Sequence, residues 1–170
     1  MNDLYRLAKD IAESGVKRVF GIPGSGPSLT LIDYLERFNV EFCLTHFEGT
    51  AAIIAGTIGR LSGITGVSIG IKGPGLANMV PGLASCFFES MPVVAITEAY
   101  SPDTPHFKAH KRLDHKKLTS AVVKESRFLS DKGLDFKLLA EQAQAEMPGP
   151  VHLDISNSSV KTDNASNDQE

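Results

Sequence analysis

The sequence predicts an α/β domain, a three-layer sandwich in which a six-stranded parallel sheet lies between helices on both faces. Three observations predict this fold. Short apolar runs alternate along the chain with longer segments that carry apolar residues at helical spacing. Glycine-rich turns join several of these runs to the helical segment that follows. The length of 170 residues suits one domain, expected over 1–156 with a polar tail over 157–170.

The first half of the chain alternates between the two periods. Leu4, Leu7 and Ile11 recur at helical spacing, and Gly15 closes this first helix. The next two helical segments carry an apolar face and a run rich in Ala, Ile and Gly, respectively. The helices predicted here cover 4–11, 27–38 and 48–61. The strands predicted here cover 18–22, 41–45 and 66–71.

The second half repeats the pattern with one long interruption. Met79, Val80 and Leu83 mark a helix over 76–88, and Leu138, Leu139 and Ala143 mark another over 134–146. The strands predicted here cover 93–97, 122–125 and 151–155. The charged stretch 98–114 is expected to be a long loop. Right-handed crossovers would place the carboxyl ends of all strands at one edge, where open sheets bind ligands.

Composition excludes several classes of protein. The net charge of −3 argues against a general nucleic-acid binder, which carries a basic excess. The chain has no apolar run long enough to span a bilayer and no secretory signal at residues 1–10, so we expect a cytoplasmic protein without membrane contact. Cys43 and Cys86 form no CxxC pattern and are expected to be buried, reduced thiols.

Two glycine loops on the expected ligand edge do not fit nucleotide-binding patterns. The loop 21–27 has the spacing GxxGxG, not the GxGxxG of dinucleotide sites, and no Gly-Lys-Ser/Thr of a P-loop follows. In the loop 72–78, Asn78 stands where a dinucleotide site needs a third glycine. A plain nucleotide-binding domain is therefore disfavoured.

Glu48 and the stretch 98–114 each allow two interpretations. Glu48 begins a helix directly after a strand, so it either complements the helix dipole or presents a carboxylate to a ligand. The stretch 98–114 is either a solvated loop or an anion-binding wall above the sheet edge. Its basic and imidazole residues are His106, Lys108, His110, Lys111 and Arg112.

Taken together, the order and spacing of these loops are specific. The chain resembles the N-terminal, pyrimidine-binding domain of thiamine-diphosphate-dependent enzymes of the acetolactate synthase and 2-oxo acid decarboxylase type. The segments that carry the resemblance are VFGIPG at 19–24, HFEGTAA at 46–52, GPGLAN at 73–78, ESMPVVAIT at 89–97 and PGPVHLDI at 148–155. The resemblance extends from about Leu4 to Ile155 and implies the thiamine-diphosphate-binding fold.

The resemblance implies that Glu48 is the catalytic carboxylate, which bonds N1′ of the cofactor's pyrimidine and shares a proton there. It also implies that the other residues in contact with the cofactor are Ile22, Pro23, Gly24, Gly73, Pro74, Gly75 and Asn78. In the family, a second domain with a GDG motif holds the diphosphate and Mg²⁺, and this chain has no GDG. We therefore expect no metal ligand here and a diphosphate-binding beta subunit as partner, in a hetero-oligomer with two or more copies of each.

Departures from the acetolactate synthase pattern bear on the substrate. Lys72, His110 and Lys111 stand where that pattern has small or uncharged residues. They would recognise a second anionic group on a 2-oxo acid, as in the separate alpha subunits of sulfopyruvate or phosphonopyruvate decarboxylase-like enzymes, or they are ordinary solvated side chains. The expected reaction is decarboxylation, with transfer to an acceptor left open. The alternatives are an acetolactate synthase-like carboligase subunit or fragment and a non-catalytic regulatory or assembly subunit.

Overall fold

A single parallel sheet with the strand order β2-β1-β3-β4-β6-β5 forms the centre of the molecule in a computed structural model, which describes residues 3–101, 103–130 and 134–157. The strands are β1 (Arg18–Gly21), β2 (Glu41–Leu44), β3 (Gly66–Gly70), β4 (Val93–Glu98), β5 (Glu125–Phe128) and β6 (Pro150–Ile155). Every residue of β3, β4 and β6 is buried, as expected for strands covered on both faces. The predicted parallel sheet is confirmed.

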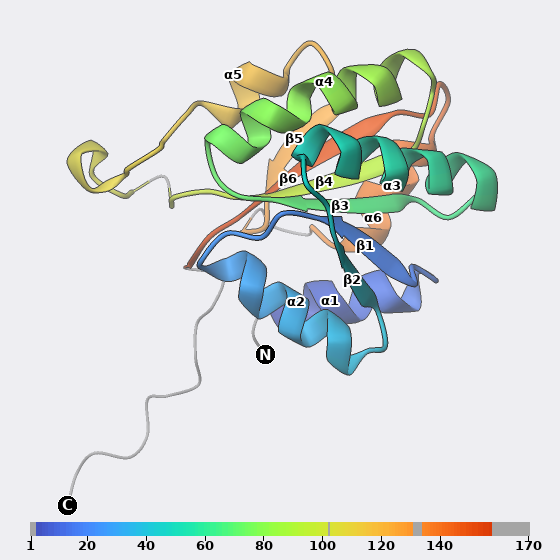
Figure 1. The fold of residues 1–170 in the computed structure, drawn as a ribbon, viewed down its shortest axis with the longest axis horizontal. Coiled ribbons are helices and arrows are strands. Elements are labelled where there is room, and N and C mark those ends of the chain that lie inside the picture. The colour runs from blue at the N-terminus through green and yellow to red at the C-terminus, as the bar shows by residue number, and fades with distance from the viewer. Residues whose placement is uncertain (1–2, 102, 131–133, 158–170) are drawn as a thin grey trace, which may run out of the picture.

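Helices cover both faces of the sheet (Figure 1). The elements are α1 (Asp3–Glu13), α2 (Pro27–Arg37), α3 (Glu48–Ser62), α4 (Pro74–Phe88), a short 3₁₀ turn (His106–Lys108), α5 (His115–Thr119) and α6 (Phe136–Gln144). One face carries α1, α2 and α6, and the other carries α3, α4 and α5. The predicted three-layer α/β fold is therefore confirmed.

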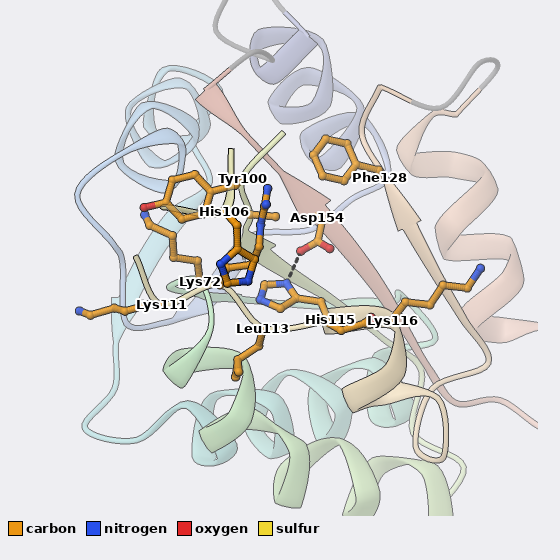
Figure 2. A pocket seen from close by; sticks show the side chains of 12 residues that line it. Lys72, Tyr100, His106, Lys111, Leu113, His115, Lys116, Phe128 and Asp154 are labelled. Atoms are coloured by element: carbon orange, nitrogen blue, oxygen red, sulfur yellow. Dashed lines mark hydrogen bonds and ion pairs between the residues drawn. The ribbon is translucent and has the colours of Figure 1, made fainter. Parts of the chain in front are cut away.

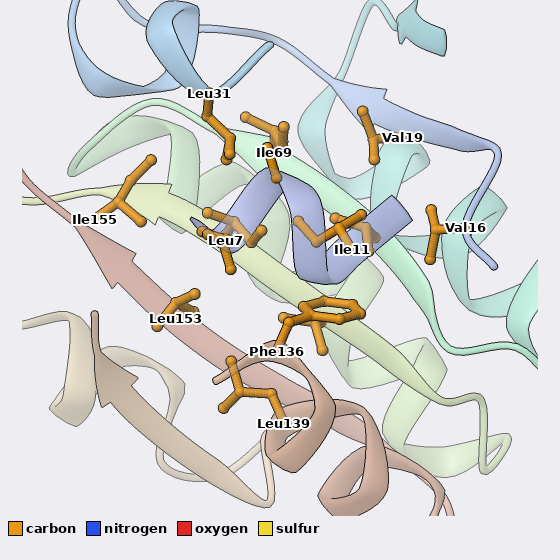
Figure 3. Packing of buried hydrophobic residues seen from close by; sticks show 14 of the residues in the cluster. Leu7, Ile11, Val16, Val19, Leu31, Ile69, Phe136, Leu139, Leu153 and Ile155 are labelled. Atoms are coloured by element: carbon orange, nitrogen blue, oxygen red, sulfur yellow. The ribbon is translucent and has the colours of Figure 1, made fainter. Parts of the chain in front are cut away.

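Two hydrophobic cores hold the layers together. The larger core lies beneath α1, α2 and α6, where Phe136 meets Leu7, Ile11 and Leu153 of the helices and sheet (Figure 3). The smaller core lies beneath α3 and α4 and is built around Leu76, Met79 and Leu83, with small residues of α3 beside them. Buried apolar area of this kind is the main favourable contribution to folding.

Helices α3 and α4 lie closer to each other than larger side chains would allow. A Cβ atom on Gly82 would stand 2.2 Å from the carbonyl oxygen of Gly49, and one on Gly56 would stand 2.6 Å from Sγ of Cys86. These glycines therefore permit the contact between the two helices, whose first residues lie at the carboxyl edge of the sheet. Both cysteines are free thiols, but only Cys86 is buried as expected, whereas Cys43 is half-buried; burial raises the pKa of the Cys86 thiol to about 12.

The fifth strand differs from its predicted position. It was expected at 122–125 but spans Glu125–Phe128. The amide groups of Val122 and Val123 donate to the carbonyl oxygen of Thr119, so these apolar residues complete the turn after α5, a helix that the sequence did not predict. The apolar pair Val122–Val123 thus packs beneath α4 and α5 rather than in the sheet.

The remaining expectations on organisation are only partly addressed. Residues 158–170 of the predicted tail lie outside the described residues, so the division at residue 156 stays a prediction. None of the helices in the described part of the chain is long and apolar enough to cross a membrane.

Candidate functional site

Glu48 occupies the first position of α3, immediately beyond the carboxyl end of β2. The residue is only 6% exposed, although glutamate side chains are rarely buried without a partner. Phe47 precedes it in an extended conformation and supplies no side-chain cap to the helix. The carboxylate thus lies at the N-terminus of α3, where the amide groups of the first helical turn point toward it.

Residues from the start of α4 surround this carboxylate. Nδ2 of Asn78 donates a hydrogen bond of 3.2 Å to Oε2 of Glu48. Gly75 presents only its Cα to the acid, and a Cβ there would lie 3.2 Å from Oε1 of Glu48 and 2.5 Å from Cγ2 of Ile71. A Cβ added to Gly70, at the end of β3, would likewise lie 3.9 Å from Cγ of Glu48. These glycines therefore let the backbone of β3 and of the first turn of α4 pack closely against the carboxylate.

The turn between β3 and α4 has a conformation that favours glycine. Gly73, the residue before α4, has φ +64° and ψ −101°. A Cβ at this position would lie 2.0 Å from the carbonyl oxygen of Lys111. The segment that follows the 3₁₀ turn therefore packs directly on the Gly73-Pro74-Gly75 turn.

A second buried acid, Glu98, joins the two glycine loops. It ends β4 and is 1% exposed. Its Oε1 accepts hydrogen bonds from the hydroxyl of Ser28 at 2.6 Å and from the amide of Gly26 at 3.2 Å, while its Oε2 is 2.9 Å from Nζ of Lys72. Burial would raise the pKa of Glu98, but the bonds from Ser28 and Lys72 outweigh burial and hold the pKa below its usual value.

Glu98 is the part of the site that sequence reasoning did not identify. A Cβ on Gly24 would stand 2.3 Å from Oε2 of Glu98, so this glycine, expected to face the cofactor, lies against the acid. The available signal was an acidic residue at the end of a strand that is otherwise wholly apolar or small.

A cavity of about 580 Å³ opens beside the Gly73 turn (Figure 2). Its lining residues are Lys72, Ala99, Tyr100, His106, Lys111, Arg112, Leu113, Asp114, His115, Lys116, Phe128 and Asp154. The side chains of Lys111 and Lys116 extend on opposite sides of the cavity (Figure 2). The guanidinium of Arg112 donates to the carbonyl oxygens of Thr104 and Ser101 and lies 5.8 Å from the ring centre of Tyr100; within the described part of the chain it forms no ion pair.

The three residues expected to contact the substrate are only partly brought together. Lys72 and Lys111 line the cavity, whereas His110 is exposed and lies outside its lining. The ammonium of Lys72 is paired with Glu98 and lies 5.5 Å from the ring centre of Tyr100. Of these two lysines, Lys111 therefore remains the more available for an anionic ligand.

A network of polar side chains, most of them buried, extends inward from His115 and Asp154 in the wall of the cavity. Nδ1 of His115 lies 2.7 Å from Oδ1 of Asp154, and the hydroxyl of Thr97 donates to the same oxygen at 3.1 Å. Nε2 of His152 lies 2.8 Å from Oγ1 of Thr97, and Nδ1 of His152 lies 2.8 Å from the hydroxyl of Ser126. Burial lowers the pKa of His152 to about 4, so this ring is neutral near neutral pH.

Three residues of this hydrogen-bonded network have the side-chain types of a metal-binding group. Ligand atoms of His115, His152 and Asp154 lie within 4.8 Å of one another. Both ring nitrogens of each histidine already have hydrogen-bond partners, and these partners account for the burial of the group. The arrangement is therefore explained as a satisfied polar network.

The other residues expected to contact the cofactor lie at the same edge of the sheet. Ile22, Pro23 and Gly24 follow β1, and the amide of Ile22 donates to the carbonyl oxygen of Ile69 in β3. The structure brings Glu48, Gly75 and Asn78 into direct proximity. A buried carboxylate whose orientation is fixed by an amide fits an aromatic ring nitrogen that shares a proton with the acid.

Comparison with known proteins identifies a family for this chain. A family model described as thiamine pyrophosphate enzyme, N-terminal TPP binding domain, matches residues 5–118. The matched segment contains Glu48, the Gly73-Pro74-Gly75 turn, Asn78 and Glu98. A search of curated proteins found no match to the chain.

Proposed function

Because the chain belongs to the family of N-terminal TPP-binding domains of thiamine pyrophosphate enzymes, we propose that it is the pyrimidine-binding subunit of a thiamine-diphosphate-dependent 2-oxo acid decarboxylase. The observation that carries this proposal is the buried carboxylate of Glu48 at the start of α3, fixed by Asn78 and facing the glycine turn of α4. We assign the catalytic role to Glu48.

Each residue around Glu48 has a definite task in this proposal. Asn78 orients the carboxylate, the start of α3 positions Glu48 at the edge of the sheet, and Gly75 lets the first turn of α4 pack closely against Ile71 and the acid. Glu48 then holds a proton between its carboxylate and N1′ of the bound pyrimidine. Bound thiamine diphosphate supplies the electron sink for the electron pair that a 2-oxo acid releases when it loses carbon dioxide.

We propose that a partner chain holds the diphosphate end of the cofactor and Mg²⁺; the 170 residues contain no GDG motif. The surface of α3 and α4 supports such a partner. Across both helices the charged residues are the buried Glu48 and Arg60, and large apolar side chains are exposed. Leu61 is 82% exposed and Phe88 is 79% exposed. We propose that this apolar face docks the diphosphate-binding subunit, in a hetero-oligomer with two or more copies of each chain.

The cavity beside the Gly73 turn supports a substrate with a second anionic group. Positive charge on its walls comes from Lys111, Arg112 and Lys116. Lys72 also lines the cavity but is paired with Glu98. A sulfonate or phosphonate on a 2-oxo acid would be attracted to such walls. We keep His110 as a further candidate because it adjoins Lys111 in the chain.

The proposal is tested with the chain purified together with its diphosphate-binding partner. Carbon dioxide release is measured from a panel of singly and doubly charged 2-oxo acids, with thiamine diphosphate and Mg²⁺. Glu48→Gln should lower kcat by about a hundredfold or more, the range for a group that acts on a proton. The matched control Glu36→Gln, at an exposed position of α2, should leave kcat unchanged.

Three outcomes would contradict parts of the proposal. Full activity of the Glu48→Gln complex would make the chain a non-catalytic assembly subunit. Turnover by the isolated chain would exclude a shared diphosphate site. Formation of a carbon–carbon bond between two 2-oxo acids as the main product would favour an acetolactate synthase-like carboligase over a decarboxylase.

A further inference from the structure

We propose that His115 is a positioning residue, which fixes the Gly73-Pro74-Gly75 turn by accepting a hydrogen bond from the amide of Gly73. Only the effect on cofactor binding rests on the proposed function, because the hydrogen bond between Gly73 and His115 forms within the folded chain itself. Nε2 of His115 lies 3.0 Å from the Gly73 nitrogen, and both residues are buried. His115 belongs to α5, a helix that lies outside the glycine loops.

The Gly73 amide has no acceptor of the ordinary helical kind. Gly73 precedes α4, and the first amides of a helix lack partners within the helix. Because the residue is buried, leaving this donor without a partner would be costly. The His115 ring supplies the acceptor from a segment that lies 42 residues further along the chain.

The hydrogen-bond network sets the tautomer that this role requires. Nε2 must be unprotonated to accept from Gly73, so the ring proton is on Nδ1 and is donated to Oδ1 of Asp154 at 2.7 Å. Asp154 is held in turn by the hydroxyl of Thr97. Both nitrogens of His115 are therefore engaged, so this ring is not free to exchange a proton with a ligand in the cavity.

The position of Gly73 is linked directly to the surroundings of Glu48. The carbonyl oxygen of Gly73 accepts from the amide of Ala77, so the turn is continuous with the first turn of α4. That turn carries Gly75, which contacts Glu48, and leads to Asn78, which bonds it. A displacement of Gly73 would therefore move both groups that orient the catalytic acid.

Two substitutions separate the two bonds of His115. Glutamine places an amide oxygen near the position of Nε2 and can still accept from Gly73, but it loses the bond to Asp154. Asparagine places an amide nitrogen near Nδ1 and can still donate to Asp154, but it offers no acceptor to Gly73. If positioning of the turn is the task of His115, glutamine should preserve it and asparagine should not.

The first measurement needs no cofactor, partner or turnover. In the ¹⁵N-labelled full chain, long-range nitrogen–proton spectra should show His115 with its proton on Nδ1, and the Gly73 amide should exchange slowly with solvent. His115→Asn should speed exchange at Gly73 by about tenfold or more, because a buried donor loses its acceptor. His115→Gln should change it by much less. A proton on Nε2 in the unsubstituted chain would overturn the inference, even if neither variant folds.

The second measurement uses the complex with the diphosphate-binding partner. His115→Asn should raise the KM for thiamine diphosphate by about tenfold, while His115→Gln stays near the unsubstituted value. Equal losses in both variants would overturn the inference, because they would place the importance of His115 in its bond to Asp154. If Glu48→Gln leaves turnover intact but exchange at Gly73 follows the pattern above, the proposed function fails while the positioning bond stands.

Discussion

Asn78 donates its side-chain amide to the carboxylate of Glu48 across 3.2 Å, so a residue of α4 orients the acid that begins α3. The two residues are 30 positions apart in the chain. They meet because the loops after β2 and β3 end at the same edge of the sheet and because glycines allow α3 and α4 to lie close together. The geometry of the proposed catalytic acid thus depends on the contact between these helices.

Asn78→Ala removes this bond without changing the charge of the site. We expect kcat/KM of the complex to fall by about tenfold to a hundredfold, the range for losing a hydrogen bond to a charged group. Ser85→Ala on the same helix is the control, since the hydroxyl of Ser85 bonds only the carbonyl oxygen of Pro81 among the described residues. Steady-state kinetics would check the difference, and equal activity of both variants would argue against orientation by Asn78.

The Lys72–Glu98 pair should show coupling in a double-mutant cycle. Glu98→Gln leaves Lys72 without its 2.9 Å partner, while the glutamine oxygen can still accept from Ser28. We expect the free energy of unfolding to fall by about 3 kcal/mol, as for a buried pair that loses one partner. Lys72→Met in the same chain should restore part of the loss. Denaturant unfolding measures all four species, and strictly additive effects would contradict a direct pair.

The free energy of unfolding should fall as the pH is lowered, because the buried ring of His152 titrates. Burial lowers the pKa of this ring to about 4 in the folded chain, against 6.5 for the ordinary group. Between these values the unfolded chain binds more protons, so the free energy of unfolding decreases as pH falls, by about 3 kcal/mol in all. The pKa of Glu98 is also lowered, but from 4.5, so its contribution is lost only at more acidic pH.

His152→Gln is the test of this assignment. Denaturant titrations between pH 6.5 and about pH 5 should show a clear slope in the original chain and a flatter one in the variant. Glutamine can still bond Thr97 or Ser126, so the variant should fold. An unchanged slope would assign the acid sensitivity to another group.

Local sequence patterns predicted the features of the site that depend on local chemistry. Glu48 could be placed at a strand-to-helix junction because periodicity and the helix start are local signals. The roles of Glu98 and His115 could not be predicted, because their partners Ser28 and Gly73 lie 70 and 42 residues away in the sequence. The fifth strand was misplaced because Val122 and Val123 form a short apolar run that packs beneath α4 and α5. A single sequence does not distinguish such a run from a buried strand.

Gly75→Ala should impair the site through lack of space. The new Cβ would lie 2.5 Å from Cγ2 of Ile71 and 3.2 Å from Oε1 of Glu48, so one of these groups must move. We expect the KM for thiamine diphosphate to rise by about tenfold. Gly63→Ala is the matched control, because Gly63 has φ +73° but open space around it. That variant should lose about 1 kcal/mol of stability and no cofactor affinity. Similar KM changes in both variants would exclude a specific effect at Gly75.

The apolar face of α3 and α4 should determine association with the diphosphate-binding subunit. Leu61→Asp and Phe88→Asp place charges on side chains that are 82% and 79% exposed, so the fold of the isolated chain should be preserved. If these side chains are covered in the complex, each charge becomes desolvated there, and the partner should bind about a hundredfold more weakly or worse. Leu29→Asp is the control, since Leu29 is 50% exposed and belongs to α2, which covers the opposite face of the sheet. Sedimentation or titration calorimetry with the purified partner would measure the change. Unaltered binding of both α3 and α4 variants, with loss only in Leu29→Asp, would move the interface to the α1, α2 and α6 layer.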